Sequence, residues 1–460
     1  MQKTDITFWL KEKLGWILIV VFSCIPVLIF LAVNDVNELF YDTRETLKTI
    51  GLVTGLVGFV LYAINMLLAI RKPWLENFFN GLNQVYIAHH ITGGIALCLV
   101  LFHPLLLAVQ YIDLGSLSSL KNAAVFLLPD TFNSQSTLEF AQEVTAFNSG
   151  IIAFIGMVVL LILTFFVKLP YSFWLFTHKF LGVAFLFAGI HVLFINSDVS
   201  DSLLLTIYMA VWICIGLGAF VYRTLLGNVL IRRAPYEVKS VAFFEKDVMG
   251  IYLAPLEKNI DFKPGQFVYV RFLWSGKDGI VDETHPFSVA TNPGIDGMVL
   301  YIKALGDFTT NLRNLKVGTV AEIEGAFGKF SYRNFSSSPQ VWIGAGIGIT
   351  PFISMARDYS LYAPPVDLYY TVQTRSELIE QGVLAQYLPE TYQNFRYFPF
   401  VSQEAQTHLT AEHILQQSGN LQGKEFFICG PPLMMKSMRS QLRKMGVKRS
   451  KIHTEEFSMS

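Results

Sequence analysis

The sequence predicts a multi-domain protein: an all-α bundle of six transmembrane helices, then an antiparallel β-barrel domain and an α/β domain with a parallel sheet. Of the 460 residues, 52% are hydrophobic and only 15% are charged, which is too apolar for an ordinary soluble protein. Long apolar runs stop near Arg223, and short alternating strands, Gly/Pro turns and amphipathic helices follow. We therefore expect domains at residues 1–228, 229–336 and 337–460. The net charge of zero gives no indication of nucleic-acid binding.

Six stretches are long and apolar enough to cross a bilayer as helices. Lys3, Lys11 and Lys13 precede the first one, as they would precede a signal peptide. That stretch is long, however, and no small-residue cleavage site follows it, so we expect a retained helix. The six expected spans are Trp16–Val33, Ile50–Ile70, Val85–Val109, Gly150–Val167, Phe173–Ile195 and Leu203–Val221.

Basic residues near the ends of these spans predict their orientation, because cytoplasmic ends are enriched in lysine and arginine. A cytoplasmic N-terminus leaves only Arg44, Lys48 and Lys121 outside. An even number of spans then returns the C-terminal half to the cytoplasm. We expect a multi-pass protein of the cell or plasma membrane with both termini inside. The basic residues on the inner side are then Lys3, Lys11, Lys13, Arg71, Lys72, Lys168, Arg223, Arg232 and Arg233.

Two of the expected spans carry histidines, which are costly in hydrocarbon and usually functional there. The third span contains His89, His90 and His103, and the fifth contains His178 and His191. At 1.5 Å per residue, His89 and His103 are about 20 Å apart along the helix, and so are His178 and His191. Both distances fit within a hydrocarbon core of about 30 Å. Two helices with a histidine near either end provide what two stacked haems need, since each iron takes one imidazole from each helix.

Helical periodicity favours His89 over His90 as the inner ligand on the third span. Fourteen residues return to within about 40° of the starting face, so His89 and His103 share a face. His90 lies about 140° from the face of His103 by the same geometry. The alternative interpretation is that these histidines are hydrogen-bonded core residues along a polar seam.

The fifth span needs an irregularity for both of its histidines to face one partner helix. His178 and His191 are thirteen residues apart, so the helix must bend or unwind between them, and Gly182 and Gly189 are candidate sites. The expected metal ligands are His89 with His178 at an inner haem and His103 with His191 at an outer haem.

Residues outside the spans suggest how the outer haem is approached. The longest external loop, residues 110–148, is expected to cap this haem and shape access for an acceptor. Arg44 and Lys48 either attract an anionic acceptor or a haem propionate, or act as interfacial anchors. Lys179 is similarly either a propionate contact or a snorkelling side chain.

The four cysteines give no sign of an iron–sulfur cluster or a disulfide framework. Cys24, Cys98 and Cys214 lie in apolar spans, where cysteine is usually a small core residue. No CxxC pair and no plant-type ferredoxin spacing occurs, so a built-in ferredoxin domain is excluded.

The segment after Tyr236 reads as a small antiparallel barrel. Strand patterns with period two recur at regular spacing, among them KPGQFVYVRF, HPFSVATNP, MVLYIKALGDFTT and VAEIEGAFGKF. The GDFTT stretch resembles the end of a strand followed by a helix, whose N–H groups and hydroxyls can receive a pyrophosphate.

The last segment switches from strand to helix three times, as in nucleotide-binding α/β domains. VWIGAGIGITPFISMA is a buried strand, a glycine-rich turn and a helix that begins near Pro351. VDLYYTVQT is a second buried strand that ends at Arg375, and EFFICGPP is a third that ends at Cys429. Arg375 can pair with a 2′-phosphate, which favours NADPH over NADH; otherwise it is an exposed loop arginine.

These stretches, in this order and spacing, resemble the ferredoxin–NADP reductase superfamily. With six histidine-bearing spans in front, nearly the whole chain resembles the ferric reductase and NADPH oxidase family. The resemblance implies that Cys429 lies near the nicotinamide and that Ser288 and Phe457 lie at the flavin. Phe457 is the candidate for the C-terminal aromatic that stacks on the isoalloxazine, although three further residues follow it.

The resemblance also implies a set of cofactor-binding residues. His285 and Phe287 stand where soluble relatives have arginine and tyrosine, as in the membrane members. The set comprises, for FAD, His285, Pro286, Phe287, Ser288, Lys303, Gly306, Asp307, Phe308, Thr309, Thr310 and Phe457, and for the nicotinamide nucleotide, Gly344, Gly346, Gly348, Thr350, Pro351, Arg375, Cys429, Gly430 and Pro431. No EF-hand loop is present, so nothing indicates calcium control.

Three functions compete at this point. The first is a membrane enzyme that passes electrons from NADPH through FAD and two b-type haems to dioxygen or chelated ferric iron outside. The second hands these electrons to an extracytoplasmic partner protein. The third is a transporter or proton-conducting bundle with a nucleotide-sensing domain, which explains buried histidines but not their matched depth on two helices.

Overall fold

The computed structural model describes residues 3–109, 138–195, 198–244, 247–273, 283–335, 337–360, 362–379 and 394–456. The chain divides into two compact units, Met1–Ile231 and Arg232–Ser460, each of which is described by itself. The outer-loop prediction for residues 110–148 and the prediction for Phe457 lie mainly or wholly outside the described residues.

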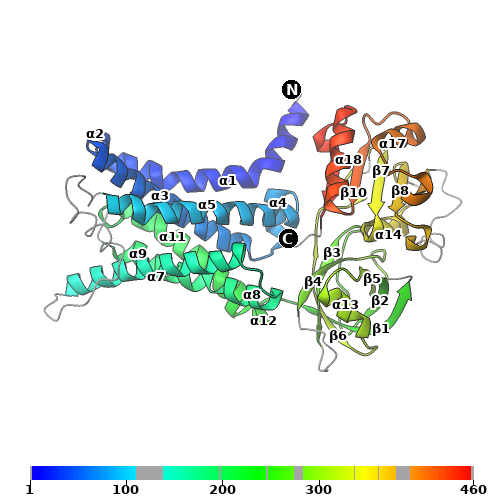
Figure 1. Cartoon of the computed structure of the whole chain (residues 1–460), viewed down its shortest axis with the longest axis horizontal. Coiled ribbons are helices and arrows are strands. Elements are labelled where there is room, and N and C mark those ends of the chain that lie inside the picture. The colour runs from blue at the N-terminus through cyan, green and yellow to red at the C-terminus, as the bar shows by residue number, and fades with distance from the viewer. Residues whose placement is uncertain are drawn as a thin grey trace. The chain divides into compact units, whose positions relative to one another are not determined.

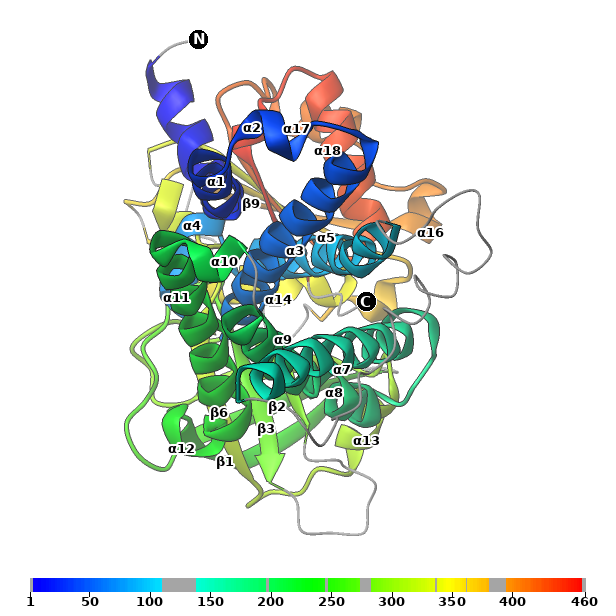
Figure 2. The same ribbon diagram turned by 90° about the vertical axis from the view of Figure 1, so that its left-hand side faces the viewer.

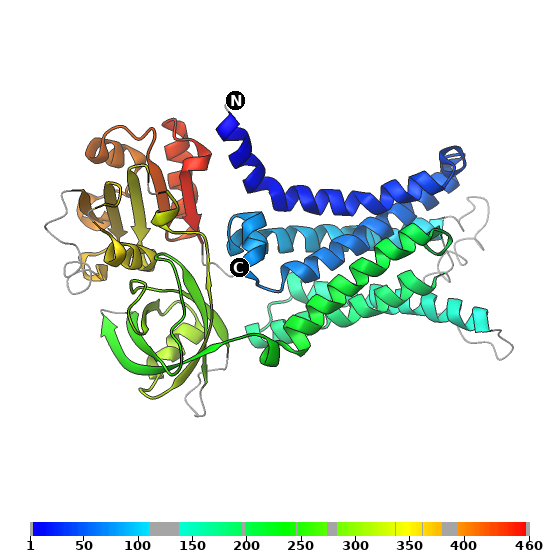
Figure 3. The same cartoon turned by 180° about the vertical axis from the view of Figure 1, so that it is seen from behind.

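Among its described residues, unit 1 contains six helical segments that are long and apolar enough to cross a membrane, as the sequence predicts (Figures 1 and 3). The fifth is interrupted and comprises α8 and α9. The long helices are α1 (Lys3–Val33), α3 (Thr43–Leu68), α5 (Leu82–Val109), α7 (Leu138–Phe166), α8 (Tyr171–Lys179), α9 (Leu181–Phe194) and α11 (Leu203–Phe220), and the short ones are α2 (Val36–Leu39), α4 (Pro73–Phe79), α10 (Asp198–Asp201), a π-helix (Val221–Leu225) and α12 (Gly227–Leu230).

Side-chain caps fix where two of the spanning helices begin. The Asp42 carboxylate accepts a hydrogen bond from the Glu45 N–H at the start of α3, and the Ser202 hydroxyl accepts one from Leu205 at the start of α11. A proline at the first turn begins α4, where no N–H is needed. The helices therefore begin where the local chemistry satisfies their free donors.

The bundle is built from two helix pairs, α3 with α5 and α7 with α9, and α11 packs on both pairs (Figure 2). Small residues bring α3 and α5 together, as in many membrane interfaces. Ala88, Thr92 and Ala96 are buried on α5, and a β-carbon at Gly51 or Gly58 on α3 would crowd leucine and valine residues of α5.

The fifth span is interrupted at Phe180, between α8 and α9. The expected irregularity is therefore present, but not at Gly182 or Gly189. Gly182 instead admits the Phe220 ring of α11, which would collide with any β-carbon there. The Tyr62 hydroxyl of α3 donates a 2.6 Å hydrogen bond to the carbonyl of Leu181, the first residue of α9. Contacts with neighbouring helices thus hold the break in place.

Unit 2 begins with an antiparallel sheet in the order β4-β3-β6-β1-β2-β5. The Ala290 N–H just beyond β4 donates to the Val299 carbonyl in β5 at 2.9 Å, which closes the sheet into a barrel. The strands are β1 (Ala234–Phe244), β2 (Val248–Pro255), β3 (Phe267–Leu273), β4 (Thr284–Ser288), β5 (Met298–Lys303) and β6 (Val320–Phe327), with α13 (Asp307–Asn311) after β5.

A parallel sheet in the order β11-β10-β7-β8-β9 follows. Its central strands are buried throughout, as expected for a sheet with both faces covered. From β7 the chain adds β8 and β9 on one side and then returns to place β10 on the other. The elements are β7 (Gln340–Ala345), α14 (Thr350–Asp358), β8 (Val366–Val372), β9 (Phe395–Val401), α16 (Ser402–Ala405), α17 (Ala411–Ser418), β10 (Glu425–Cys429), α18 (Pro432–Lys444) and β11 (Ile452–Glu455).

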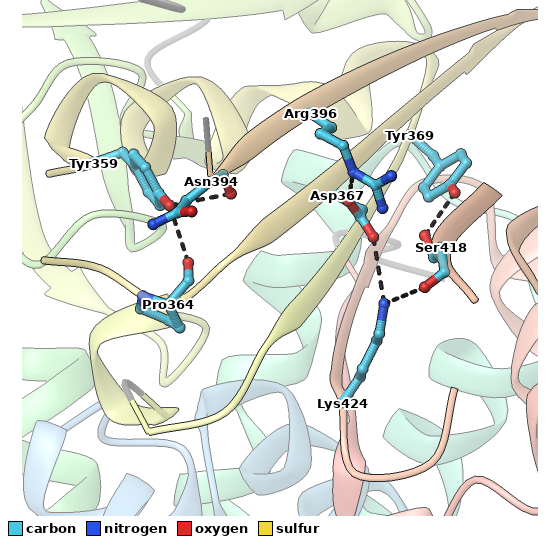
Figure 4. A network of polar contacts seen from close by, with 8 residues as sticks. All are labelled: Tyr359, Pro364, Asp367, Tyr369, Asn394, Arg396, Ser418 and Lys424. Atoms are coloured by element: carbon cyan, nitrogen blue, oxygen red, sulfur yellow. Dashed lines mark hydrogen bonds and ion pairs between the residues drawn. The ribbon is translucent and has the colours of Figure 1, made fainter. Parts of the chain in front are cut away.

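A polar network crosses the amino-terminal edge of this sheet (Figure 4). The Asp367 carboxylate of β8 accepts a 2.7 Å hydrogen bond from Arg396 on β9 and lies 3.4 Å from the Lys424 ammonium before β10. Lys424 also donates to the Ser418 carbonyl at the end of α17, and the Tyr369 hydroxyl bonds the Ser418 hydroxyl at 2.7 Å. These contacts secure the edge that lies opposite the expected nucleotide site.

Candidate functional site

The structure brings the four predicted histidines together as two pairs. The rings of His89 on α5 and His178 on α8 have their centroids 6.2 Å apart, and those of His103 on α5 and His191 on α9 are 6.3 Å apart. The side chain of His90 is exposed on α5. The two pairs therefore occupy two levels of the same helical segments.

This separation fits a metal ion shared between two imidazoles. A metal–imidazole bond is about 2 Å long, so rings on opposite faces of one ion have centroids roughly 6 Å apart. Within the described residues, no group of three or more His, Cys, Asp or Glu converges on one point, so these are two-ligand sites. Two axial imidazoles are the donor set of a bis-histidine haem, whose macrocycle supplies the other four ligands.

The Nδ1 atoms of three of the rings bond backbone carbonyls, which can only accept. His103 donates to Gly51 at 2.8 Å, His191 to Ala146 at 3.0 Å and His89 to Asn65 at 3.1 Å. Such bonds fix the tautomer and leave Nε2 with a lone pair for a metal. The histidine chemistry therefore fits haem.

Glycines make room for the outer imidazoles. A β-carbon at Gly55 would lie 2.5 Å from His103 Nδ1, and one at Gly150 would lie 2.6 Å from His191 Nδ1. Each glycine is four residues after the carbonyl that accepts the hydrogen bond, at Gly51 and Ala146 respectively. The two outer histidines are therefore seated in the same way on α3 and α7.

In unit 2, the HPFS strand and the GDFTT turn meet in space. The His285 ring of β4 stacks on the Phe308 ring of α13, with centroids 3.8 Å apart, and its Nε2 lies 2.9 Å from the Glu283 carboxylate. The Thr309 hydroxyl accepts hydrogen bonds from the N–H groups of Leu305 and Gly306. His285, Phe308 and the turn held by Thr309 are thus gathered at one place, and Lys303 ends the preceding strand β5.

The glycine-rich turn after β7 lies against the CGPP turn after β10. A β-carbon at Gly348 would collide with the Cys429 carbonyl, and one at Gly430 would lie 2.7 Å from the Ala345 β-carbon. Gly346 has φ +54°, a conformation that favours glycine. The strand order reverses between β7 and β10, and open α/β sheets bind nucleotides at such a reversal.

Sequence reasoning missed Glu455, a buried carboxylate at this site. Glu455 is the register partner of Cys429, and a β-carbon at Gly328 would lie 2.8 Å from Glu455 Oε1 and 3.2 Å from the Phe267 ring. Phe267 in turn pairs with Ser288. Ser288, Cys429 and Glu455 therefore belong to one neighbourhood. The signal available in the sequence was an acidic pair directly before the C-terminal aromatic.

The thiol at this site stays protonated. Burial, together with the negative charge of Glu455, raises the pKa of Cys429 well above its usual value. A neutral thiol is a poor nucleophile, so the arrangement favours a packing or orienting role for Cys429 over covalent chemistry.

Arg375, the residue expected at a 2′-phosphate, is already engaged by a carboxylate. Its Nε and Nη2 atoms lie 2.8 and 2.7 Å from the two Glu404 carboxylate oxygens, a bidentate pair. The hydrogen bond from Arg375 lowers the pKa of the exposed Glu404, which therefore stays ionised at neutral pH. A phosphate at this position has to compete with Glu404.

Three family sequence models match successive parts of the chain. They are described as ferric reductase like transmembrane component (residues 54–189), FAD-binding domain (234–337) and oxidoreductase NAD-binding domain (342–440). The chain has the domain architecture of the ferric reductase and NADPH oxidase family. As in that family architecture, a ferric reductase like transmembrane component is followed by an FAD-binding domain and an NAD-binding domain.

Individual relatives match smaller parts of the chain. The electron transfer component of anthranilate 1,2-dioxygenase from Acinetobacter baylyi is 27% identical over 44% of this chain, which spans 60% of that relative's length. Dual oxidase 2 from Rattus norvegicus is 34% identical over 22% of this chain and 7% of that protein. Among solved structures, Amycolatopsis cytochrome P450 reductase GcoB aligns with 49% of this chain and 70% of its own, at 23% identity and a TM-score of 0.43.

Proposed function

We propose that the chain passes electrons from cytoplasmic NADPH across the membrane to a small acceptor, dioxygen or chelated ferric iron. The observation that carries this proposal is that two histidine pairs, with ring centroids 6.2 and 6.3 Å apart, lie at two levels between the third and fifth spans. When bound, FAD and two b-type haems would accept the hydride, divide it into single electrons and conduct them across the bilayer.

The four histidines would hold the two haems, His89 with His178 on the inner side and His103 with His191 on the outer side. Each haem would be held by two histidines, so the acceptor would receive electrons without binding at iron. The protein holds the Nδ1 atom of each imidazole by a hydrogen bond, and this directs the Nε2 atom towards the partner ring of the pair. Orientation rests on the basic residues, which are concentrated at the ends assigned to the cytoplasm.

The carboxyl edge of the parallel sheet would receive the nucleotide. The turn from Gly344 to Gly348 would approach the phosphates, with the CGPP turn beside it. Arg375 would take the 2′-phosphate, which favours NADPH, with NADH as the competing nucleotide. Ser288, Cys429 and Glu455 would line the place where nicotinamide and flavin meet.

The experiment is made on the full chain in detergent with FAD and NADPH. The haem content and absorption spectrum are measured, then superoxide release with and without superoxide dismutase, and finally anaerobic reduction of a ferric chelate. We expect two low-spin b-type haems per chain. Dismutase-sensitive superoxide identifies an NADPH oxidase, whereas fast anaerobic iron reduction with little superoxide identifies a ferric reductase. A chain without haem contradicts the proposal.

Ligand variants test the assignment of the outer site. His103→Ala or His191→Ala should remove one haem, while flavin reduction by NADPH continues, because the flavin site is formed by other residues. Retention of two haems per chain by either variant refutes the assignment.

A further inference from the structure

The outer imidazoles are oriented by the backbone. His103 Nδ1 donates to the carbonyl of Gly51 and His191 Nδ1 to that of Ala146. Both carbonyls lie within long helices and remain in place whatever side chain the residue carries. No side chain is therefore required to accept these two N–H groups.

The inner His178 differs, because its nearest acceptor is a hydroxyl. The Thr164 Oγ1 atom of α7 lies 3.4 Å from His178 Nδ1. The Thr164 hydroxyl donates its own hydrogen to the Leu160 carbonyl at 2.8 Å, so it is left to accept from the ring. The Trp174 ring stacks on His178 at 5.1 Å and 16°. Thr164 and Trp174 together fix the direction of this imidazole.

Asn65 contacts the inner His89 through both its backbone carbonyl and its side-chain amide. The Asn65 carbonyl accepts from His89 Nδ1, and its side-chain amide donates to the His89 carbonyl and, at 3.0 Å, to the Thr92 hydroxyl. Asn65 is buried, and Gly93 of α5 leaves space for its amide. The last turn of α3 thereby fixes the rotation of α5 at the level of the inner pair.

We infer that Thr164 and Asn65 are positioning residues of the inner histidine pair. The Thr164 hydroxyl orients His178, whereas backbone carbonyls accept from the other three rings, and the Asn65 side-chain amide holds α5 beside His89. The inference rests on the proposed function, because it concerns a haem held by these histidines. A hydrogen bond from Nδ1–H makes the imidazole a more basic ligand, which stabilises the ferric over the ferrous state. Loss of the acceptor at Thr164 therefore raises the reduction potential of the inner haem.

The test is a spectroscopic redox titration of Thr164→Val, which replaces the hydroxyl by a methyl group of similar size. We expect one haem to shift to a more positive potential while the other is unchanged. Thr164→Ser, which keeps the hydroxyl, should retain the original value. Thr206→Val is the matched control, because Thr206 lies in α11 and its hydroxyl bonds only the Val199 carbonyl among the contacts described.

The same titration in the His103→Ala background shows which haem has moved. If this background retains both haems, the proposed ligand assignment fails. If it retains one haem whose potential Thr164→Val leaves unchanged, the inference fails and the assignment stands. An equal shift of both haems in the otherwise unaltered chain also overturns the inference.

Asn65→Leu provides a second readout. It removes the amide donor but keeps the backbone carbonyl, so we expect the inner haem to be lost from a fraction of the chains while the outer haem is retained. The outer haem reports that the bundle has folded. Equal loss of both haems would show a general structural role and contradict a positioning role.

Discussion

Glycine determines where the outer imidazoles can lie. Gly55 and Gly150 leave the surfaces of α3 and α7 open at the points where His103 and His191 rest. The same absence of a β-carbon brings each ring within reach of a backbone carbonyl one turn away. Ligand position at this level thus depends on residues that have no side chain.

Gly150→Ala is expected to displace the His191 imidazole from its position against α7. The new methyl group would lie 2.6 Å from Nδ1, and overpacking of this kind costs about 1–3 kcal/mol. We expect the outer haem to be lost or to become high-spin, as measured by haem content and absorption spectrum. Gly94→Ala is the matched control, because a β-carbon there meets nothing within 4 Å. Normal low-spin haem in Gly150→Ala would contradict this account.

Glu404 sets the availability of Arg375. Because Glu404 holds both Nε and Nη2, we expect Glu404→Gln to release the guanidinium and to lower the KM for NADPH by about twofold to fivefold, since an exposed ion pair is weak. The KM for NADH, which lacks the 2′-phosphate, should stay the same. An unchanged ratio of the two KM values would show that Arg375 does not meet the 2′-phosphate.

At the scale of the element, the interruption at Phe180 reconciles a thirteen-residue spacing with two facing histidines. The need for an irregularity follows from the helical period alone. Its place does not, because no proline or glycine occupies position 180. The Tyr62 hydroxyl on the Leu181 carbonyl and the Phe220 ring at Gly182 locate it, and both come from other helices.

In the parallel sheet, too, the local sequence pattern predicts the strands and turns but not the contacts between residues on different strands. Buried strands and glycine-rich turns were sufficient to predict β7, α14 and β10. Glu455 was missed because its position depends on the parallel pairing of β11 with β10, a contact between segments whose register no local pattern specifies. Glu404 likewise reaches Arg375 only through the pairing of β8 with β9.

At the scale of the whole molecule, we expect unit 2 to be weakened by acid. Burial alone would raise the pKa of Asp367 and Glu425, but hydrogen bonds from Arg396 to Asp367 and from His453 and Lys451 to Glu425 outweigh it, so both pKa values are lowered. A lowered folded-state pKa stabilises the protein at neutral pH, and this contribution is lost as the pH falls below about 4.

The measurement is the release of FAD from the full chain in increasing urea, which is monitored by flavin fluorescence at several pH values between 7 and 3. The urea midpoint should fall as the pH falls. Asp367→Asn should lower the free energy of unfolding at pH 7 by about 1–2 kcal/mol, because the contacts with Arg396 and Lys424 lose the carboxylate charge. The variant should also show a weaker dependence on pH. A midpoint that does not vary between pH 7 and pH 3 would contradict this role.

The division of unit 1 into the pairs α3–α5 and α7–α9 has a consequence for how the protein matures. The first half carries His89 and His103 on α5, and the second carries His178 on α8 and His191 on α9. Each half therefore brings one imidazole to each level. In addition to α11 and the hydrogen bond from Tyr62 on α3 to Leu181 on α9, the cofactors themselves would then join the two halves. We expect chains made under haem shortage to hold these halves less firmly and to be removed sooner by membrane proteases.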